Sequence, residues 1–135
     1  MIGLHIAKLL ETLNFGTLDT DIFYEEVTLD GNGVPKQGLW VVERGSTVTR
    51  FNSRIQQVDI YSRYNNKLTG AKKLEQILNY FADHYNDICT LPAVEPYSSE
   101  VYSNIRIVPV SSLENVGADE NGKIIRVISI EVTYS

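Results

Sequence analysis

Residues 67–88 read KLTGAKKLEQILNYFADHYNDI, and this stretch decides how the second half of the chain folds. Its apolar side chains recur at steps of three and four residues, which places them on one face of a helix. The recurring residues are Ala71, Leu74, Ile77, Leu78, Phe81, Ala82, Tyr85 and Ile88. The pattern predicts a long amphipathic helix over 67–88, and we expect Leu78 and Phe81 to be buried against a sheet.

The part of the chain before this helix is predicted to contain another helix and three strands. A helix is expected over residues 2–14, because an apolar stripe at helical spacing is formed by Ile2, Ile6, Leu9, Leu10 and Leu13. Gly16 follows and is expected to close this helix in the left-handed conformation. Runs of β-branched and aromatic residues predict strands over 21–29, 39–42 and 55–63.

Two connections between these strands have a recognisable composition. Residues 30–33, Asp-Gly-Asn-Gly, are a strong turn signal. We therefore expect the strands at 21–29 and 39–42 to form a hairpin with a long connection. Residues 44–53, RGSTVTRFNS, lack a clean period and are expected to form a projecting basic loop.

The C-terminal part is predicted to return to strands. Pro92 and Pro96 exclude a helix there and indicate a surface connection. Strands are expected over residues 105–110 and 123–134, with a hairpin turn at 119–122, Asp-Glu-Asn-Gly. One face of the last strand carries Ile124, Ile128, Ile130, Val132 and Tyr134.

The predicted order is α-β-β-β-α-β-β, without the strand-helix-strand alternation that builds a doubly wound parallel sheet. We therefore expect an α+β fold with a single antiparallel or mixed sheet and the helices packed on it. With 135 residues, 43% of them hydrophobic and 21% charged, residues 1–135 are expected to form a single domain with one core.

Several protein classes are disfavoured by the composition. The apolar runs are far shorter than the roughly 20 residues that span a bilayer, so no membrane partner is expected. The N-terminal residues lack the pattern of a secretory signal, and we expect synthesis in a cytoplasm. Cys89 is the only cysteine, so the chain can form neither an internal disulfide nor a cysteine cluster for zinc.

Two side chains could in principle carry chemistry, and each has a simpler interpretation. His84 lies beside Asp83 and Asp87, but it falls off the apolar stripe and is expected to be solvated rather than to bind a metal. Cys89 has no recognisable base or family signature around it, and we expect a small buried side chain rather than a nucleophile.

No other motif predicts catalysis or cofactor binding. The two Asp-x-Asn-Gly segments at 30–33 and 119–122 lack the ligand series and closing glutamate of a calcium loop. The sequence also has no phosphate-binding loop and no dinucleotide-binding glycine pattern. We therefore expect a protein that is not an enzyme, with no catalytic residues, no cofactor and no metal.

Charge is unevenly distributed in this chain of net charge −5. Residues 19–30 are acidic with no lysine or arginine, whereas residues 44–64 contain four arginines and one aspartate. One acidic and one basic surface could serve a head-to-tail contact between identical subunits. The predicted interface residues are Arg44, Arg50, Phe51, Arg54 and Arg63 on one surface and Asp19, Asp21, Glu25 and Glu26 on the other.

The basic stretch also permits an alternative function. Its arginines alternate with Phe51, Tyr61 and Tyr64, and such a surface could pair with phosphates and stack on bases. A small nucleic-acid-associated binding module is therefore the second hypothesis. Trp40 is expected in the core, although a tryptophan on a short strand beside a loop could also anchor a contact.

Several segments together resemble a known family. These are a helix ending in LNFG, the segment DIFYEEV, a glycine-proline loop, and RFNSRIQQVDIYSRY leading into KLTGAKKLEQILNYF. In element order and length, the chain is similar to the tail-terminator or minor capsid proteins of long-tailed, siphovirus-type bacteriophages.

The resemblance implies a structural virion subunit in the tail or neck. Such a subunit would form a ring, hexameric in that family, that caps the tail tube, ends its polymerisation and joins the tail to the head connector. The implied partners are other copies of the chain, the tail tube protein and the connector protein. DNA would pass through the lumen without specific binding.

Overall fold

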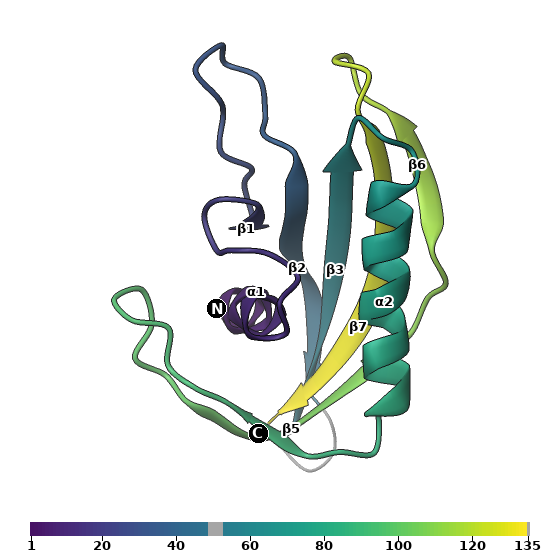
Figure 1. The fold of residues 1–135 in the computed structure, drawn as a ribbon. Helices are drawn as coiled ribbons and strands as arrows, with labels where there is room; N and C mark the ends of the chain where they lie inside the picture. Colours follow the sequence, from purple (N-terminus) through teal and green to yellow (C-terminus); the bar gives the residue numbers. More distant parts are fainter. Residues whose placement is uncertain (49–52, 135) are drawn as a thin grey trace.

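Two helices lie on the same side of a mixed sheet (Figure 1). The computed structural model describes residues 1–48 and 53–134. Within these residues the elements are α1 (Ile2–Thr12), β1 (Ile22–Tyr24), β2 (Gly38–Val48), β3 (Arg54–Tyr64), α2 (Thr69–Asp83), β4 (Cys89–Leu91), β5 (Tyr102–Pro109), β6 (Glu114–Ala118) and β7 (Ile124–Tyr134). The α+β class and the predicted order are confirmed, with β4 and β6 as additional short strands.

β7 is the strand around which the sheet is organised. The strand order is β1-β2-β3-β7-β5-β4, and β6 also pairs with β7. β3 and β7 are antiparallel along eleven residues, from the pair Arg54 and Tyr134 to the pair Tyr64 and Ile124. The opposite edge of β7 is shared, because β6 pairs with its first half and β5 with its second half.

The turn at residues 119–122 joins β6 to β7, which are adjacent antiparallel strands. The Asp119 carboxylate accepts hydrogen bonds from the backbone N–H groups of Asn121 (2.8 Å) and Lys123 (3.0 Å). Gly122 has a φ of 75°, a left-handed conformation that glycine adopts without steric cost. The predicted hairpin turn is confirmed.

The pairing of the first two strands differs from the prediction. β1 comprises only Ile22–Tyr24 and is parallel to β2, so the expected antiparallel hairpin of 21–29 with 39–42 is wrong. Because β1 and β2 run in the same direction, the chain has to return between them to the end of the sheet where β1 begins. Residues 25–37 provide this return in a loop that is closed by a β-bridge between Leu29 and Pro35. The turn inside this loop is confirmed, because the Asp30 carboxylate accepts two backbone hydrogen bonds there.

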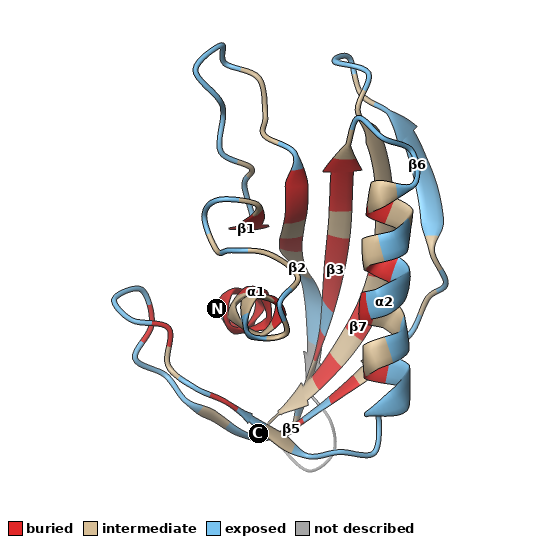
Figure 2. Ribbon diagram, in the orientation of Figure 1, coloured by how far each residue is buried: buried red, intermediate tan, exposed pale blue. Residues whose placement is uncertain are grey.

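The hydrophobic core lies between the helices and one face of the sheet (Figure 2). Alternate residues of the strands point into it, as expected for a half-covered sheet. Fully buried members from the central strands are Leu39, Val41, Val58, Ile60, Ile128, Ile130 and Val132. Phe81 is buried as predicted, whereas Leu78 packs against the core and is only half-buried, so its prediction is confirmed in part.

α2 ends earlier than the apolar pattern predicts. The backbone N–H of His84 still bonds to the carbonyl of Tyr80 (3.1 Å), but the chain then turns towards β4. Tyr85 and Ile88 are 50% and 61% exposed, so their predicted place on the buried stripe is wrong. The apolar period continues in residues 85–88, although this segment has already left the helix and leads to β4 at the edge of the sheet.

α1 also ends two residues before its predicted end, and Asn14 rather than Gly16 closes it. Asn14 has a φ of 67°, and its backbone N–H bonds to the Glu11 carbonyl at 3.0 Å. The N–H of Phe15 bonds to the Leu10 carbonyl, also at 3.0 Å. These two bonds are the pattern of a Schellman motif, in which asparagine can replace glycine as the left-handed residue.

The first turn of α1 is capped from a distant strand. Glu43 of β2 accepts a hydrogen bond from the Gly3 backbone N–H at 2.6 Å, and its carboxylate lies 3.8 Å from the terminal amine of Met1. A carboxylate at this end of a helix satisfies a free N–H and interacts favourably with the helix dipole.

The predicted basic loop at residues 44–53 is partly a strand. β2 continues to residue 48 and contains a β-bulge between Glu43 and Ser46. Residues 49–52 lie outside the described part of the chain. None of the helices in the described residues is long and apolar enough to cross a membrane.

Candidate protein-binding face

The sheet face opposite the helices, called the open face below, carries a mixed aromatic, aliphatic and charged surface. Strand register places its residues in rows, because directly paired residues point to the same face. The rows are Gly38, Arg63 and Ile125; Trp40, Tyr61 and Val127; and Val42, Asp59 and Ser129. Among the described residues no helix packs against these rows.

Trp40 lies on the open face rather than in the core. Its ring stacks on the neighbouring ring of Tyr61, with centroids 4.8 Å apart and planes 10° apart. Both side chains are only half-buried. The expected core position for Trp40 is therefore wrong, and the other possibility, an aromatic group available for a contact, remains.

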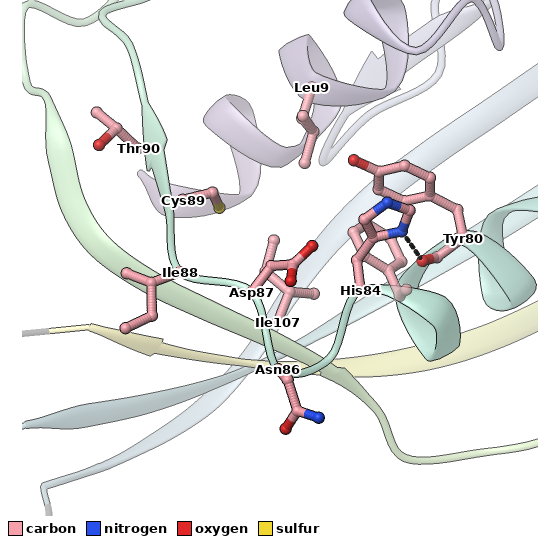
Figure 3. Close-up of a pocket in the computed structure, with 10 residues that line it drawn as sticks. Leu9, Tyr80, His84, Asn86, Asp87, Ile88, Cys89, Thr90 and Ile107 are labelled. Carbon is pink, nitrogen blue, oxygen red and sulfur yellow. Dashed lines mark hydrogen bonds between the residues drawn. The ribbon is translucent and has the colours of Figure 1, made fainter.

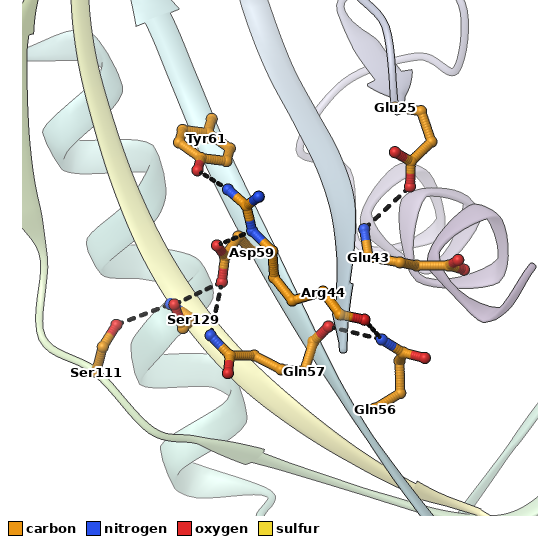
Figure 4. Close-up of polar contacts among 9 residues, drawn as sticks. All are labelled: Glu25, Glu43, Arg44, Gln56, Gln57, Asp59, Tyr61, Ser111 and Ser129. Carbon is orange, nitrogen blue, oxygen red and sulfur yellow. Dashed lines mark hydrogen bonds and ion pairs between the residues drawn. The ribbon is translucent and has the colours of Figure 1, made fainter. Parts of the chain in front are cut away.

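Arg44 is held beside Tyr61 by a carboxylate (Figure 4). The β-bulge in β2 places its guanidinium near β3, where its Nε donates to an oxygen of Asp59 at 2.7 Å and an Nη group donates to the Tyr61 hydroxyl. The guanidinium carbon is 5.9 Å from the centroid of the Tyr61 ring. The hydrogen bond to Asp59 raises the pKa of Arg44, so this arginine stays charged.

Asp59 is the centre of the polar network on the open face. Its side chain is only 10% exposed, although it lies on the side of the sheet without helices. Besides the bond from Arg44, it accepts hydrogen bonds from the Ser129 hydroxyl (2.7 Å) and from the Gln57 amide (3.3 Å). These three donors satisfy the buried carboxylate, and their hydrogen bonds fix the side chains around it.

Arg63 is buried in a second ion pair and is not a free surface cation. Its side chain is 7% exposed and pairs with Asp119 from the turn between β6 and β7. This pair borders a groove of about 570 Å³ over the open face. The loop at residues 25–37 forms the other wall through Glu26, Val27, Leu29 and Pro35, and Trp40 and Ile125 lie between the two walls.

The remaining predicted basic residues are separated by the structure. Arg54 is exposed at the start of β3, and among the described residues no carboxylate lies within ion-pair distance of it. Arg50 and Phe51 lie outside the described residues. The predicted basic surface is therefore brought together only in part, with Arg44 and Arg63 held by internal carboxylates.

The predicted acidic residues also divide into two groups. Asp21 accepts a hydrogen bond from the Thr17 backbone N–H at 2.6 Å, and Glu25 accepts one from the Glu43 backbone N–H at 3.0 Å. These two carboxylates stabilise local turns and the edge of β2. Asp19 and Glu26 are exposed and form no ion pair with a described residue.

A pocket of about 580 Å³ lies between α1, the end of α2 and strands β4 and β5 (Figure 3). It brings His84, Asp87 and Cys89 to one region of the molecule. Burial and the nearby Asp87 raise the pKa of the Cys89 thiol, which disfavours the thiolate. His84 is exposed, as predicted, and its Nδ1 bonds to the Tyr80 carbonyl at 2.7 Å.

Among the described residues no three histidine, cysteine or carboxylate side chains are grouped closely enough to hold an ion. Cys89 packs against the core and is half-buried, so it is less buried than the sequence predicts.

His5 has a structural role that the sequence did not indicate. It is 1% exposed, and its Nδ1 lies 2.9 Å from the Pro92 carbonyl oxygen, an acceptor, so Nδ1 carries the proton. Its Nε2 forms a hydrogen bond with the Ser98 hydroxyl at 2.9 Å. His5 thereby holds residues 92–101, the arm between β4 and β5, against α1. A histidine between apolar helix positions gives no sequence signal for such a distant partner.

Comparison of the sequence with models of known protein families and with curated proteins gives no match.

Proposed function

We propose that this protein is a structural subunit that assembles with copies of itself into a ring on the end of a phage tail tube. The ring, hexameric in the family that the sequence resembles, stops tube polymerisation and joins the tail to the head connector. In this function the protein forms contacts and catalyses no reaction. DNA passes through the lumen, and the protein is located in the tail or neck of the virion.

The observation that carries the proposal is the uncovered face of the sheet. It presents the stacked pair Trp40 and Tyr61, with Val42 and Val127 in adjacent positions, on the side without helices. Tryptophan, tyrosine and arginine are the residues most enriched at the energetic centres of protein interfaces. An open face with this composition is suited to contact with another protein.

The ordered arginine supports the same interpretation. Arg44 is fixed by Asp59 and Tyr61 before any partner binds, so little side-chain entropy is lost when a contact forms. One of its terminal nitrogens, Nη1, forms none of these bonds and can meet an acceptor on a partner. The side chain is 46% exposed.

A second candidate function is a nucleic-acid-associated binding module. The guanidinium of Arg44 over the Tyr61 ring and the exposed Arg54 favour it, because arginine and aromatic rings together contact phosphates and bases. We rank it second because carboxylates already neutralise Arg44 and Arg63 and the net charge is −5.

The proposal is tested by the mass of the protein in solution, measured by size-exclusion chromatography with light scattering over a range of concentrations. We expect a monomer that converts to a sixfold assembly. Trp40→Ser should remove the assembly and leave the fold intact, since Trp40 is outside the core. Tyr85→Ser is the matched control, because Tyr85 is an exposed aromatic residue beyond the end of α2, and it should assemble like the parent.

Two results would contradict the proposal. One is a stable twofold dimer with no larger species, because an isologous pair uses its surface differently from a closed ring. The other is duplex DNA binding by a protein that stays monomeric. If that binding falls steeply with salt and is lost in Arg44→Ala, the second candidate replaces the first.

A further inference from the structure

A second pocket, of about 310 Å³, lies beside the start of α1 and is called the socket below. Its walls come from three segments: α1, the residues around β1, and the arm at residues 92–101. Its lining consists of Met1, Leu4, Leu18, Asp19, Tyr24, Glu26 and Tyr97, and the Met1 amine lies 3.8 Å from the Glu43 carboxylate. We infer that the socket receives the Arg54 side chain of a second copy of this chain, an inference that rests on the proposed self-assembly.

The chemistry of the lining suits a long side chain with a cationic end. Leu4 and Leu18 offer apolar surface to an aliphatic stem, and the rings of Tyr24 and Tyr97 can face a guanidinium. Asp19 and Glu26 supply two carboxylates, and neither is in an ion pair with a described residue. Arginine fits better than lysine, because its planar group both stacks on aromatic rings and donates to two acceptors.

The third wall of the socket is held in place by the buried histidine. His5 binds Pro92 and Ser98 of the arm, and a backbone bridge joins Val94 to Ser98. Val94 and Ser98 are buried, whereas Tyr97 between them is 60% exposed. Figure 1 shows the arm extending from the sheet on the side of α1. The socket is therefore formed before a partner arrives.

Arg54 is the cation of the basic stretch that remains available among the described residues. Arg44 and Arg63 are held by Asp59 and Asp119, while Arg54 is exposed at the first position of β3. Its paired residue on the next strand is Tyr134, close to the C-terminal end of the described chain. A long side chain at a strand end can reach beyond its own molecule.

The two surfaces belong to different parts of the chain, as a head-to-tail contact requires. The socket is built by α1, the β1 segment and the arm, and Arg54 belongs to β3. A head-to-tail contact joins two different patches and closes into a ring or continues as a filament. The acidic socket and the basic strand end are two such patches, and they therefore suit the proposed ring.

The test is a charge-reversal experiment with two variants. The socket variant is Asp19→Asn with Glu26→Lys; asparagine is chosen because residue 19 has a φ of 68°, which asparagine tolerates. The strand-end variant is Arg54→Glu. Matched controls are Glu75→Lys with Asp83→Asn for the socket and Lys72→Glu for the strand end, since all three residues are exposed on α2.

We expect each variant alone to assemble at least about tenfold more weakly than the parent, because the contact then loses its attraction between opposite charges. The controls should assemble like the parent. An equimolar mixture of the two variants should restore assembly. In one type of contact, the lysine introduced at position 26 of the socket variant meets the glutamate introduced at position 54 of the strand-end variant. In the other type, the native socket of the strand-end variant meets the native Arg54 of the socket variant. Rescue in the mixture also demonstrates that both variants are folded.

The results separate this inference from the proposed function. A parent that stays monomeric at every concentration overturns both. A parent that assembles, with variants that match their controls or a mixture that fails to recover, overturns the socket alone and leaves the ring proposal standing. Loss of duplex DNA binding in Arg54→Glu with unchanged assembly would also overturn the socket and assign Arg54 to nucleic acid.

Discussion

The two faces of the sheet are built from the same strands but differ in what covers them. On the helix side, Val58 and Ile60 of β3 are fully buried, whereas Tyr61 on the open face is half-exposed. The helix side is stabilised by apolar packing against α1 and α2. The open face is ordered by carboxylates, with Asp59 and Asp119 each holding an arginine.

This difference separates the residues that stabilise the fold from those that the proposed assembly would use. A face that was only an exposed surface would not require a carboxylate buried to 10% exposure with three hydrogen-bond donors. The network fixes Arg44 and Tyr61 beside Trp40 while leaving their outer surfaces accessible. We therefore expect substitutions on the helix side to act on folding, and substitutions of the aromatic residues on the open face to act on assembly.

The largest effect on stability is expected for Phe81→Ala. Phe81 is 2% exposed on α2, and its truncation should lower the free energy of unfolding by about 3–5 kcal/mol through the cavity left behind. Urea denaturation measures this loss. Leu78→Ala, at a half-buried position of the same helix, should cost clearly less. Equal effects at the two positions would contradict the assigned orientation of α2.

The next largest effect is expected on the open face, for Asp59→Ala. Removal of this carboxylate leaves Ser129, Gln57 and Arg44 without their acceptor, which should cost about 1–3 kcal/mol. Arg44→Ala should cost less, because that side chain is 46% exposed. If thermal melts of the two variants show the opposite order, the open face is not organised around Asp59.

A smaller effect is expected for Glu43→Gln at the start of α1. The substitution keeps a hydrogen-bond acceptor for Gly3 but removes the charge near the helix terminus, and we expect a loss of about 0.3–1 kcal/mol. Glu75→Gln, an exposed change on α2, serves as the control. The difference between the two melting temperatures should shrink in high salt, and a salt-independent difference would argue against a charge effect.

The last expected effect is a decline of stability that appears only in alkaline solution. Burial, followed by the nearby charge of Glu43, raises the pKa of Tyr24, and burial with a hydrogen bond to Glu100 raises the pKa of Tyr102. Above the ordinary tyrosine pKa of about 10, the unfolded chain releases these protons while the folded chain retains them. Stability should therefore fall as the pH rises above that value.

The tyrosine contribution can be isolated with a double variant. Tyr24→Phe with Tyr102→Phe should reduce the slope of unfolding free energy against pH above about pH 10, where only the unfolded tyrosines titrate. An unchanged slope in denaturant titrations would show that these two phenols are not responsible.

Much of the fold follows from local patterns in the sequence. The apolar stripe that ends at Phe81 and the alternation of buried and less buried residues along β7 are clear sequence signals, because one side of each element is buried. The parallel pairing of β1 with β2 was not predictable in this way, because a turn signal at 30–33 fits a hairpin and an isolated loop equally well. The end of α2 was misplaced because Tyr85 and Ile88 continue the apolar period without packing.

The candidate site was less predictable than the fold. Charge counting found the basic stretch, but it could not show that Asp119 would bury Arg63 from a turn far along the chain. The bulge that brings Arg44 onto Tyr61 has no sequence signal beyond Gly45, and His5 gave no indication of its contact with Ser98. These features depend on contacts between residues distant in sequence.

The central claim, that the open face becomes an interface, is tested most directly by the fluorescence of Trp40. It is the only tryptophan in the chain, so emission and acrylamide quenching report on the open face alone. Both are measured beside light scattering as the protein is concentrated. We predict that quenching falls and emission shifts to shorter wavelength as the sixfold species forms. Assembly with unchanged quenching and emission of Trp40 would contradict the claim.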